Sequence, residues 1–497
     1  MGHFATRGNA RHMSLLRKVL PRVTSLALVV AAPLLSIFTD TEALCEQSSR
    51  APNIVLILAD DLGYGDLSCY GCPDINTPKL DRLAQQGVLL TDCYSNGSVC
   101  SPTRAALMTG RYQQRIGLEW AVYYQAHGEG LPPDEKSVAR MIRDAGYATA
   151  MAGKWHLGYD DGWTPNDHGF DRFFGSLGGN VHYFQHVDRL GVPDLFLDRT
   201  PVKRKGYATD LTADFAVEVI DTPAGRPFFL YVALNAPHFP YQGPDDVDRV
   251  VKPRTNGWQE GTRRSYVAMV ERLDEAVGRI VEAVDRRGLG ERTLVVFTSD
   301  NGGAPHSRND PCSKGKGTLW EGGIRVPCIA RWTGVLPPGV RSPQVACTID
   351  WAATVAKLAG AEPPADRPFD GIDLMPILRG DRGPVERTLF WRRALDPRRR
   401  GVEPHRAVRQ GEWKYIDQPD GTQYLYNLPS DVGEQHNLAA EHPDRAAAMR
   451  QLLDRWEDDV DPPLYDQRSQ AIATRNGPST PRKRARPDSI PDARKRP

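Results

Sequence analysis

The sequence has almost no net charge and contains no apolar run long enough to cross a membrane. Its 497 residues include 63 basic and 62 acidic side chains, so no global electric field draws the chain to nucleic acid. The N-terminal apolar stretch, residues 26–38, is shorter than the about 20 residues that a membrane-spanning helix needs. We therefore expect no nucleic-acid partner and no stable membrane span.

The sequence also lacks the two C-x-x-C pairs that are typical of zinc sites. Of the eight cysteines, Cys69 and Cys72 alone are spaced C-x-x-C, whereas zinc sites of this type need a second such pair. The two cysteines lie in a Gly-rich segment, and an exported chain can form disulfides. We therefore favour a local disulfide, or pairing with other loop cysteines, over a redox or zinc site. The sequence does not fix the pairing.

The N-terminus has the pattern of an export signal. Four basic residues between positions 11 and 22 precede the apolar stretch, and Thr41 and Ala43 are placed at the −3 and −1 positions of a possible cleavage site. We interpret residues 1–43 as a signal peptide. This interpretation predicts an exported protein, periplasmic or secreted, with an uncleaved anchor as the alternative.

Strand and helix patterns alternate over residues 52–380. Residues 53–59 form a continuous apolar run, as in a strand buried on both faces. Residues 262–287 carry apolar side chains at helical spacing. The alternation predicts an α/β domain, a large doubly wound mixed sheet flanked by helices. Its other expected elements are a helix that begins near residue 77 and strands at residues 88–91, 148–152, 228–234 and 293–298.

The pattern changes near residue 380. Short strand candidates at residues 388–391, 406–410, 413–416 and 423–426 precede a helix at about residues 445–460. We expect residues 381–465 to form a smaller C-terminal α+β subdomain, an antiparallel sheet with one helix. Residues 466–497 are rich in Pro, Arg, Lys and Ser and lack apolar periodicity, which predicts a disordered basic tail. A solvated tail is the favoured interpretation, and contact with polyanions is the alternative.

Polar residues follow two of the predicted strands directly. Asp60 and Asp61 come after the first strand, and Asp300 and Asn301 come after the strand at residues 293–298. In open α/β sheets, ligands bind beyond the carboxyl ends of the strands. Three carboxylates and one amide oxygen suit a hard divalent cation such as Ca²⁺. A turn or cap pair after a strand is the alternative for Asp60 and Asp61 alone.

The run from Cys100 to Arg111 places a cysteine at the start of a helix. Ser101 is a candidate N-cap, Pro102 suits the first helical position, and Gly110 is placed to end the helix. The Cys100 side chain would then lie where backbone N–H groups favour negative charge, with Arg104 one turn along the same face. This pattern predicts an anion site with a reactive group at its centre. The alternative is a buried cysteine at the start of an ordinary core helix.

Basic and acid–base residues follow other predicted strands. Lys154 and His156 stand two residues apart after the strand at 148–152, so in an extended chain they share a face. His238 follows the strand at 228–234, and Lys316 lies in a Gly-rich loop close to Lys314. Taken singly, each is more often a structural or solvated side chain.

The run C-S-P-T-R-A-A-L-M-T-G-R resembles the signature of the type I sulfatases, and residues 52–445 resemble that family, whose fold is alkaline-phosphatase-like. The resemblance implies that a maturation enzyme oxidises Cys100 to formylglycine (3-oxoalanine), an aldehyde that hydrates to a diol. It implies that one Ca²⁺ is bound by an oxygen of modified Cys100 together with Asp60, Asp61, Asp300 and Asn301. It also maps the catalytic roles onto Cys100, Arg104, Lys154, His156, His238 and Lys316.

The implied reaction is hydrolysis of a sulfate ester, in a sulfated carbohydrate or an aryl sulfate. The cations would face the sulfate oxygens, and one hydroxyl of the hydrate would attack sulfur. His238 or Lys316 would protonate the departing oxygen, and His156 would take a proton from the second hydroxyl. Two alternatives stay open: a phosphonate monoester or phosphodiester hydrolase on the same fold, and a non-catalytic protein that binds sulfated glycans.

Overall fold

The computed structural model describes residues 51–222, 224–249, 251–393 and 404–462. The expected signal peptide and the expected basic tail lie outside these ranges. Every element given below belongs to one unit, Pro52–Pro497. Among the described residues, no helix has both the length and the apolar character that crossing a membrane requires.

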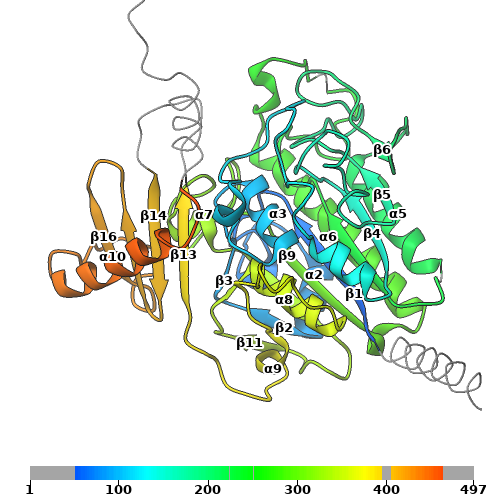
Figure 1. Ribbon diagram of the computed structural model, residues 1–497. Helices are drawn as coiled ribbons and strands as arrows, with labels where there is room; N and C mark the ends of the chain where they lie inside the picture. The colour runs from blue at the N-terminus through cyan, green and yellow to red at the C-terminus, as the bar shows by residue number, and fades with distance from the viewer. Residues whose placement is uncertain (1–50, 223, 250, 394–403, 463–497) are drawn as a thin grey trace, which may run out of the picture. The chain divides into compact units, whose positions relative to one another are not determined.

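A ten-stranded sheet lies at the centre of this unit (Figure 1). Its five central strands are parallel, and antiparallel pairs occur toward both edges. The order across the sheet is β11 (Val340–Ser342), β2 (Val88–Leu90), β10 (Cys328–Arg331), β9 (Thr293–Ser299), β1 (Asn53–Ala59), β8 (Phe228–Ala233), β4 (Ala148–Gly153), β5 (Arg172–Gly175), β6 (Phe196–Leu197) and β7 (Thr200–Pro201). A separate two-stranded sheet joins β3 (Cys93–Tyr94) to β12 (Ala346–Cys347).

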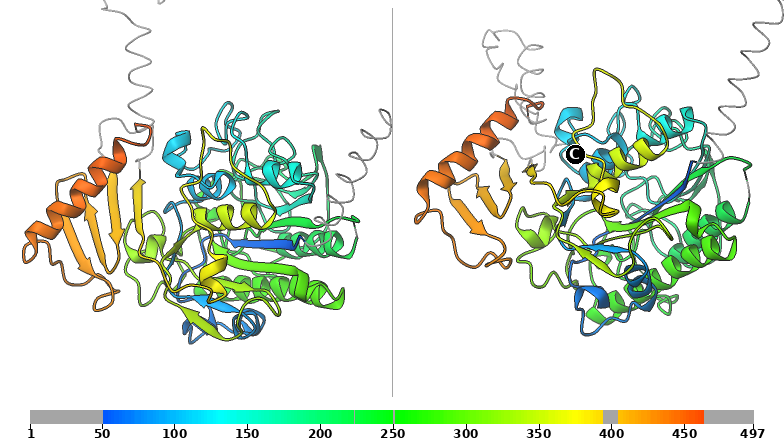
Figure 2. Two further views of the ribbon diagram at one scale, coloured as in Figure 1. Left: turned by 60° about the horizontal axis from the view of Figure 1, so that its bottom comes forward. Right: turned by 90° about the horizontal axis from the view of Figure 1, so that it is seen from below.

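Helices cover both faces of the large sheet (Figure 2). One group packs together as α2 (Pro78–Gln85), α5 (Ala208–Asp221) and α6 (Arg263–Arg286), and the other as α3 (Cys100–Thr109), α4 (Val138–Asp144) and α8 (Thr348–Leu358). Every residue of β1 and β9 is buried, as strands between two helical layers require. The predicted doubly wound α/β architecture is confirmed. The short helices are α7 (Glu321–Ile324), α9 (Met375–Leu378), η1 (Ser68–Tyr70), η2 (Gln113–Ile116), η3 (Asn256–Trp258) and η4 (Gly290–Arg292).

The predicted C-terminal elements form a four-stranded antiparallel sheet with one helix packed on it (Figure 1). The strands are β13 (Thr388–Arg393), β14 (His405–Gln410), β15 (Trp413–Asp417) and β16 (Gln423–Asn427), and the helix is α10 (Pro443–Glu457). Apolar side chains of this sheet share one core cluster with Tyr94, Ala106 and Ile349 of the larger part. The domain boundary near residue 380 stays a prediction.

The predicted disulfide is not formed. The seven cysteines among the described residues, which include Cys69 and Cys72, are free thiols.

Several short strands have no clear sequence signal. The strands β5, β6 and β7 are two to four residues long, too short for an alternating pattern to stand out.

Candidate active site

The predicted site residues meet at the carboxyl edge of four adjacent strands. The register places Ala59 of β1 opposite Ser299 of β9, so Asp60 and Asp300 leave the sheet side by side. The backbone N–H of Asp300 donates to the Ala59 carbonyl (3.1 Å), and that of Asp60 donates to the Ala236 carbonyl (3.1 Å). These bonds extend the sheet beyond its strands and fix the acidic residues at its edge.

Lys154 enters the same edge from β4. Its backbone N–H donates to the Ala233 carbonyl at the end of β8 (2.8 Å). The preceding Gly153 has φ 100°, and a Cβ atom there would lie 2.0 Å from the Ala233 carbonyl oxygen. Only glycine fits this close approach, so Gly153 is what turns the chain toward the site.

Helix α3 begins at Cys100, two residues earlier than predicted, with Val99 as its N-cap and Gly110 at φ 69° as its C-cap. The predicted N-cap role of Ser101 is therefore wrong. The Ser101 hydroxyl instead donates to the His156 carbonyl (2.9 Å) and accepts from the Val122 N–H (3.0 Å). The consequence for Cys100 is unchanged, because its side chain still lies in the first turn, where backbone N–H groups favour negative charge.

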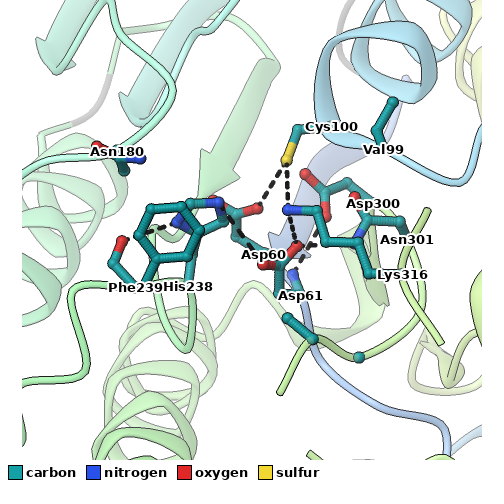
Figure 3. Close-up of polar contacts among 12 residues, drawn as sticks. Asp60, Asp61, Val99, Cys100, Asn180, His238, Phe239, Asp300, Asn301 and Lys316 are labelled. Atoms are coloured by element: carbon teal, nitrogen blue, oxygen red, sulfur yellow. Dashed lines mark hydrogen bonds and ion pairs between the residues drawn. The ribbon is translucent and has the colours of Figure 1, made fainter. Parts of the chain in front are cut away.

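Three carboxylates and Lys316 lie around Cys100 (Figure 3), and Arg104 and Lys154 pair with two of these carboxylates. The Cys100 thiol lies 3.3 Å from Asp60 Oδ1 and 3.4 Å from Lys316 Nζ. Lys154 Nζ lies 2.6 Å from Asp60 Oδ2, and Lys316 Nζ lies 2.6 Å from Asp61 Oδ1. We call this group the site cluster; its members are Asp60, Asp61, Asp300, Arg104, Lys154 and Lys316.

Arg104 forms an ion pair with Asp300 in the site cluster. Its Nε and Nη2 both donate to Asp300 Oδ2, at 3.0 and 2.8 Å, and its Nη1 donates to the Lys154 carbonyl (2.9 Å). Both side chains of the Arg104–Asp300 pair are fully buried. Because one oxygen of Asp300 is held by two N–H groups, the other oxygen points in a fixed direction.

The two histidines are held in defined orientations. His156 Nε2 lies 3.0 Å from the Val122 carbonyl, a pure acceptor, so Nε2 carries the proton and Nδ1 keeps its lone pair. Nδ1 has no hydrogen-bond partner among the described residues. His238 Nδ1 likewise donates to the Phe239 carbonyl (2.8 Å), and its Nε2 lies 3.6 Å from Asp61 Oδ2. Each ring therefore presents one free nitrogen.

Burial and charge shift the pKa values of the site residues. Burial alone would raise the pKa of Asp61, but the Lys316 ammonium and His238 have the larger effect and lower this pKa to about 2. Burial and the nearby Asp60 carboxylate raise the pKa of Asp300 to about 6 and that of the Cys100 thiol well above its ordinary value. Burial, with Lys154 and Arg104, lowers the pKa of His156, which is therefore neutral. Cys100 is accordingly a thiol, not a thiolate.

Two buried oxygen atoms beside Asp60 and Asp300 have no hydrogen-bond partner in the described part of the chain. They are Asp61 Oδ2 and Asn301 Oδ1. Asn301 Nδ2 donates to Asp61 Oδ1 (2.8 Å), which turns its oxygen outward from that bond. Ligand atoms of Asp60, Asp61, Cys100 and His238 also lie within 4.8 Å of one another. Buried oxygens without partners, next to other carboxylates, fit a hard cation with oxygen ligands.

The sequence analysis missed Asn180. This residue is 2% exposed, lies in the loop that follows β5, and is drawn with the site residues in Figure 3. Its Nδ2 donates to the Tyr124 hydroxyl (2.5 Å), and its Oδ1 has no hydrogen-bond partner among the described residues. A single asparagine in a Gly-rich loop carries no sequence signal that could have found it.

Comparison with protein families and curated proteins gives consistent matches. A family model described as Sulfatase matches residues 52–361, and one described as N-sulphoglucosamine sulphohydrolase, C-terminal, matches residues 315–459. Arylsulfatase A of Homo sapiens is 35% identical over 464 residues, which cover 81% of this chain and 87% of that protein. N-acetylgalactosamine-6-sulfatase of Canis lupus familiaris is 36% identical over 370 residues, 69% of each chain.

Solved structures share the fold. The crystal structure of Ps i-CgsB superimposes with a TM-score of 0.77 at 32% identity and covers 86% of this chain and 99% of that chain. The crystal structure of Ps i-CgsB in complex with k-i-k-neocarrahexaose gives a TM-score of 0.76 at 31% identity, over 86% of this chain and 97% of that chain. The expected resemblance is thus confirmed in sequence and in fold.

Proposed function

The chain belongs to the sulfatase family and is a sulfuric ester hydrolase, and from this premise we propose that it hydrolyses sulfate esters of carbohydrates through formylglycine at position 100 and bound Ca²⁺. Two similar proteins support the substrate class. One is an N-acetylgalactosamine-6-sulfatase, and the other was crystallised with k-i-k-neocarrahexaose. A sulfated sugar would enter with its sulfate group directed at residue 100.

The position of Cys100 is the observation that carries the proposal. Its side chain is at the N-terminus of α3, in contact with Asp60 and Lys316. An unmodified thiol is a poor nucleophile here because burial keeps it protonated. Hydrated formylglycine supplies, when formed, an oxygen nucleophile for attack on sulfur and a second hydroxyl that allows sulfate to leave. Because Cys100 is 2% exposed, its maturation enzyme must act before folding is complete.

The metal ligands we assign are Asp60, Asp61, Asp300 and Asn301, with an oxygen of modified residue 100. The free Asp61 Oδ2 and Asn301 Oδ1 and the second oxygen of Asp300 are donors that Ca²⁺ accepts. We leave His238 out of the set because a nitrogen ligand is disfavoured by this hard cation. The site cluster is neutral by itself, so a Ca²⁺ held by these residues would supply a net positive charge for the anionic ester and would act as a Lewis acid toward an oxygen of residue 100.

The cations of the chain act on the sulfate group from two sides. Lys154 and Lys316 border residue 100, where their ammonium groups stabilise charge on the sulfate oxygens. Arg104 makes its direct contacts with Asp300, so we assign it to fixing that ligand and to the positive field behind it. All three charges are held by carboxylates before substrate arrives, which avoids reorganisation during the reaction.

Protons move at two atoms. Lys316 Nζ and His238 Nε2 both lie on the Asp61 side of the site, but burial lowers the pKa of His238 to about 3 and leaves its Nε2 without a proton, so we assign protonation of the departing sugar oxygen to Lys316. His156 Nδ1 keeps its lone pair because Nε2–H is bound by the Val122 carbonyl. A neutral, oriented imidazole of this kind serves as the base that takes the proton when sulfate is released.

The test is turnover by the wild type and Cys100→Ala. We expect the wild type to hydrolyse an aryl sulfate and at least one member of a panel of defined sulfated mono- and oligosaccharides, and Cys100→Ala to lose at least about 10⁴-fold in turnover. Full activity of Cys100→Ala would overturn the proposal. An aryl phosphonate assayed side by side decides the alternative, because faster turnover of the phosphonate would favour a phosphonate monoester hydrolase.

We also propose that the protein is exported, on the pattern of residues 1–43.

A further inference from the structure

Lys316 lies in a loop, outside any strand or helix. Residues 313–320 connect the loop after β9 to the four-residue helix α7. Within the larger part, the Lys316 N–H donates to the Gly303 carbonyl (3.0 Å) and the Gly317 N–H to the Ser98 carbonyl (2.8 Å). The side chain is 20% exposed, the most accessible of the site cluster. Its placement at 2.6 Å from Asp61 therefore depends on what fixes the segment.

Glu434 fixes both ends of that segment. Its Oε2 accepts a hydrogen bond from the Ser313 hydroxyl (2.7 Å) and another from the backbone N–H of Glu321 (2.7 Å). Its Oε1 accepts from Lys414 Nζ (2.8 Å). Glu434 comes from the loop after β16, so one carboxylate beside the C-terminal sheet binds residues on either side of Lys316.

Glu434 belongs to a second set of buried charges. Lys414 of β15 is fully buried and also lies 2.8 Å from Glu321 Oε1, and Glu321 in turn accepts from Arg325 Nη1 (3.1 Å). Arg325 and Arg409 both pair with Asp92, at 3.0 and 2.8 Å. We call this group the support cluster; its members are Asp92, Glu321, Glu434, Arg325, Arg409 and Lys414.

The backbone at Glu434 is itself strained. Glu434 has φ 54°, a left-handed conformation that side chains other than glycine rarely adopt. Its N–H donates to the Asp431 carbonyl (3.1 Å), which closes the turn that aims the side chain inward. Strain at a buried, charged residue is characteristic of positions whose geometry matters for function.

We propose that Glu434 is a positioning residue that fixes residues 313–321 and so holds the Lys316 ammonium in the active site. The inference rests on the proposed function, because it assigns Glu434 an effect on catalysis only through Lys316. A lysine displaced by about 1 Å loses much of its stabilisation of the sulfate oxygens. The C-terminal part therefore contributes to turnover through the position of Lys316.

The experiment compares Glu434→Gln in two backgrounds. Gln keeps the size of the side chain but removes its charge and places a donor where Lys414 also donates. We expect Glu434→Gln to lower kcat for an aryl sulfate about tenfold in the wild type with KM nearly unchanged. In the Lys316→Ala background it should change kcat by less than about twofold, since the group it positions is gone. Equal losses in both backgrounds would overturn the inference.

Two further measurements separate positioning from folding and from the proposed function. Amide hydrogen exchange of residues 313–321 should accelerate in Glu434→Gln and not in Asp417→Asn, a control that disrupts the partly buried Arg406–Asp417 pair of the same sheet. Ser313→Ala, which removes one bond to Glu434 and leaves the charges intact, should accelerate exchange less and lower kcat by about twofold. Unchanged exchange in Glu434→Gln would overturn the inference. Faster exchange in a chain whose wild type hydrolyses no sulfate ester would instead overturn the proposed function and confine Glu434 to a structural role.

Formylglycine content at residue 100, measured by peptide mass, must be matched among the variants. Glu434 lies far from residue 100 in the sequence, so we expect equal modification. If Glu434→Gln alone lost modification, its lower kcat would report maturation, and the positioning inference would be overturned.

Discussion

The site cluster and the support cluster contain equal numbers of acidic and basic side chains, but one forms a ligand site and the other a structural network. Each combines three buried or nearly buried carboxylates with three cations, so both are neutral as they stand. In the support cluster, no carboxylate oxygen is left without a partner among the described residues. Beside Cys100, Asp61 Oδ2 and Asn301 Oδ1 are left without one. Unsatisfied buried oxygens, more than buried charge, distinguish a ligand site from a structural network.

The largest expected effect is on the site cluster. We expect Lys154→Ala to lower kcat/KM for an aryl sulfate about 10³-fold, because its ammonium borders the sulfate position. The protein should stay folded when Ca²⁺ is present, since the cation compensates Asp60. Steady-state kinetics with circular dichroism check both statements. Retained activity would show that Lys154 only neutralises Asp60, as Lys414 neutralises Glu434.

The matched change in the support cluster should act on stability. Lys414, like Lys154, is fully buried. We expect Lys414→Met to lower the free energy of unfolding by about 3–5 kcal/mol, because Glu321 and Glu434 would lose their shared cation. Urea denaturation measures the loss. A stability equal to that of the wild type, with kcat reduced as far as in Lys154→Ala, would erase the distinction between the clusters.

The next prediction concerns the dependence of the site cluster on Ca²⁺. Chelation should abolish turnover, and added Ca²⁺ should restore it and raise the melting temperature. Asn301→Ala removes one of the free oxygens, so the Ca²⁺ concentration for half-maximal stabilisation should rise about 10–100-fold. Asn53→Ala is the control, an amide at the opposite end of β1 that bonds Thr293. An Asn301→Ala protein with unchanged Ca²⁺ dependence would remove Asn301 from the ligand set.

The smallest effect is the pH dependence that comes from Asp61. Its pKa is about 2 in the folded protein against an ordinary 3.8, because Lys316 and His238 outweigh burial. A lowered carboxyl pKa stabilises the folded state above pH 4, and this contribution is lost as the pH falls toward 2. In chelator, the stability of the wild type relative to Asp61→Asn should therefore fall by about 1 kcal/mol between pH 5 and pH 3. A constant difference by urea denaturation would show that Asp61 is not ion-paired.

Much of the fold and the site could be predicted from local patterns. The continuous apolar run of β1 and the helical stripe of α6 are visible in the sequence, and their observed bounds differ from the expected ones by at most one residue. Asp60 and Asp300 could be placed together because parallel strands end at one edge. Lys154, His156, His238 and Lys316 depended on the resemblance, since a basic residue after a strand is common.

The rest depends on contacts between distant residues. The orientation of His156 comes from the carbonyl of Val122 and the hydroxyl of Ser101, neither of which has a sequence signature. Glu434 lies more than a hundred residues from Lys316, and only the packing of the C-terminal sheet on the larger part brings it to Ser313. Such contacts follow from tertiary packing, which spacing along one chain does not report.

The mass of the peptide that contains residue 100, isolated from enzyme that turns over an aryl sulfate, tests the central claim most directly. The account predicts a peptide about 18 Da lighter than the unmodified cysteine form, since the thiol has become an aldehyde. A fully active preparation in which residue 100 is entirely cysteine would contradict it.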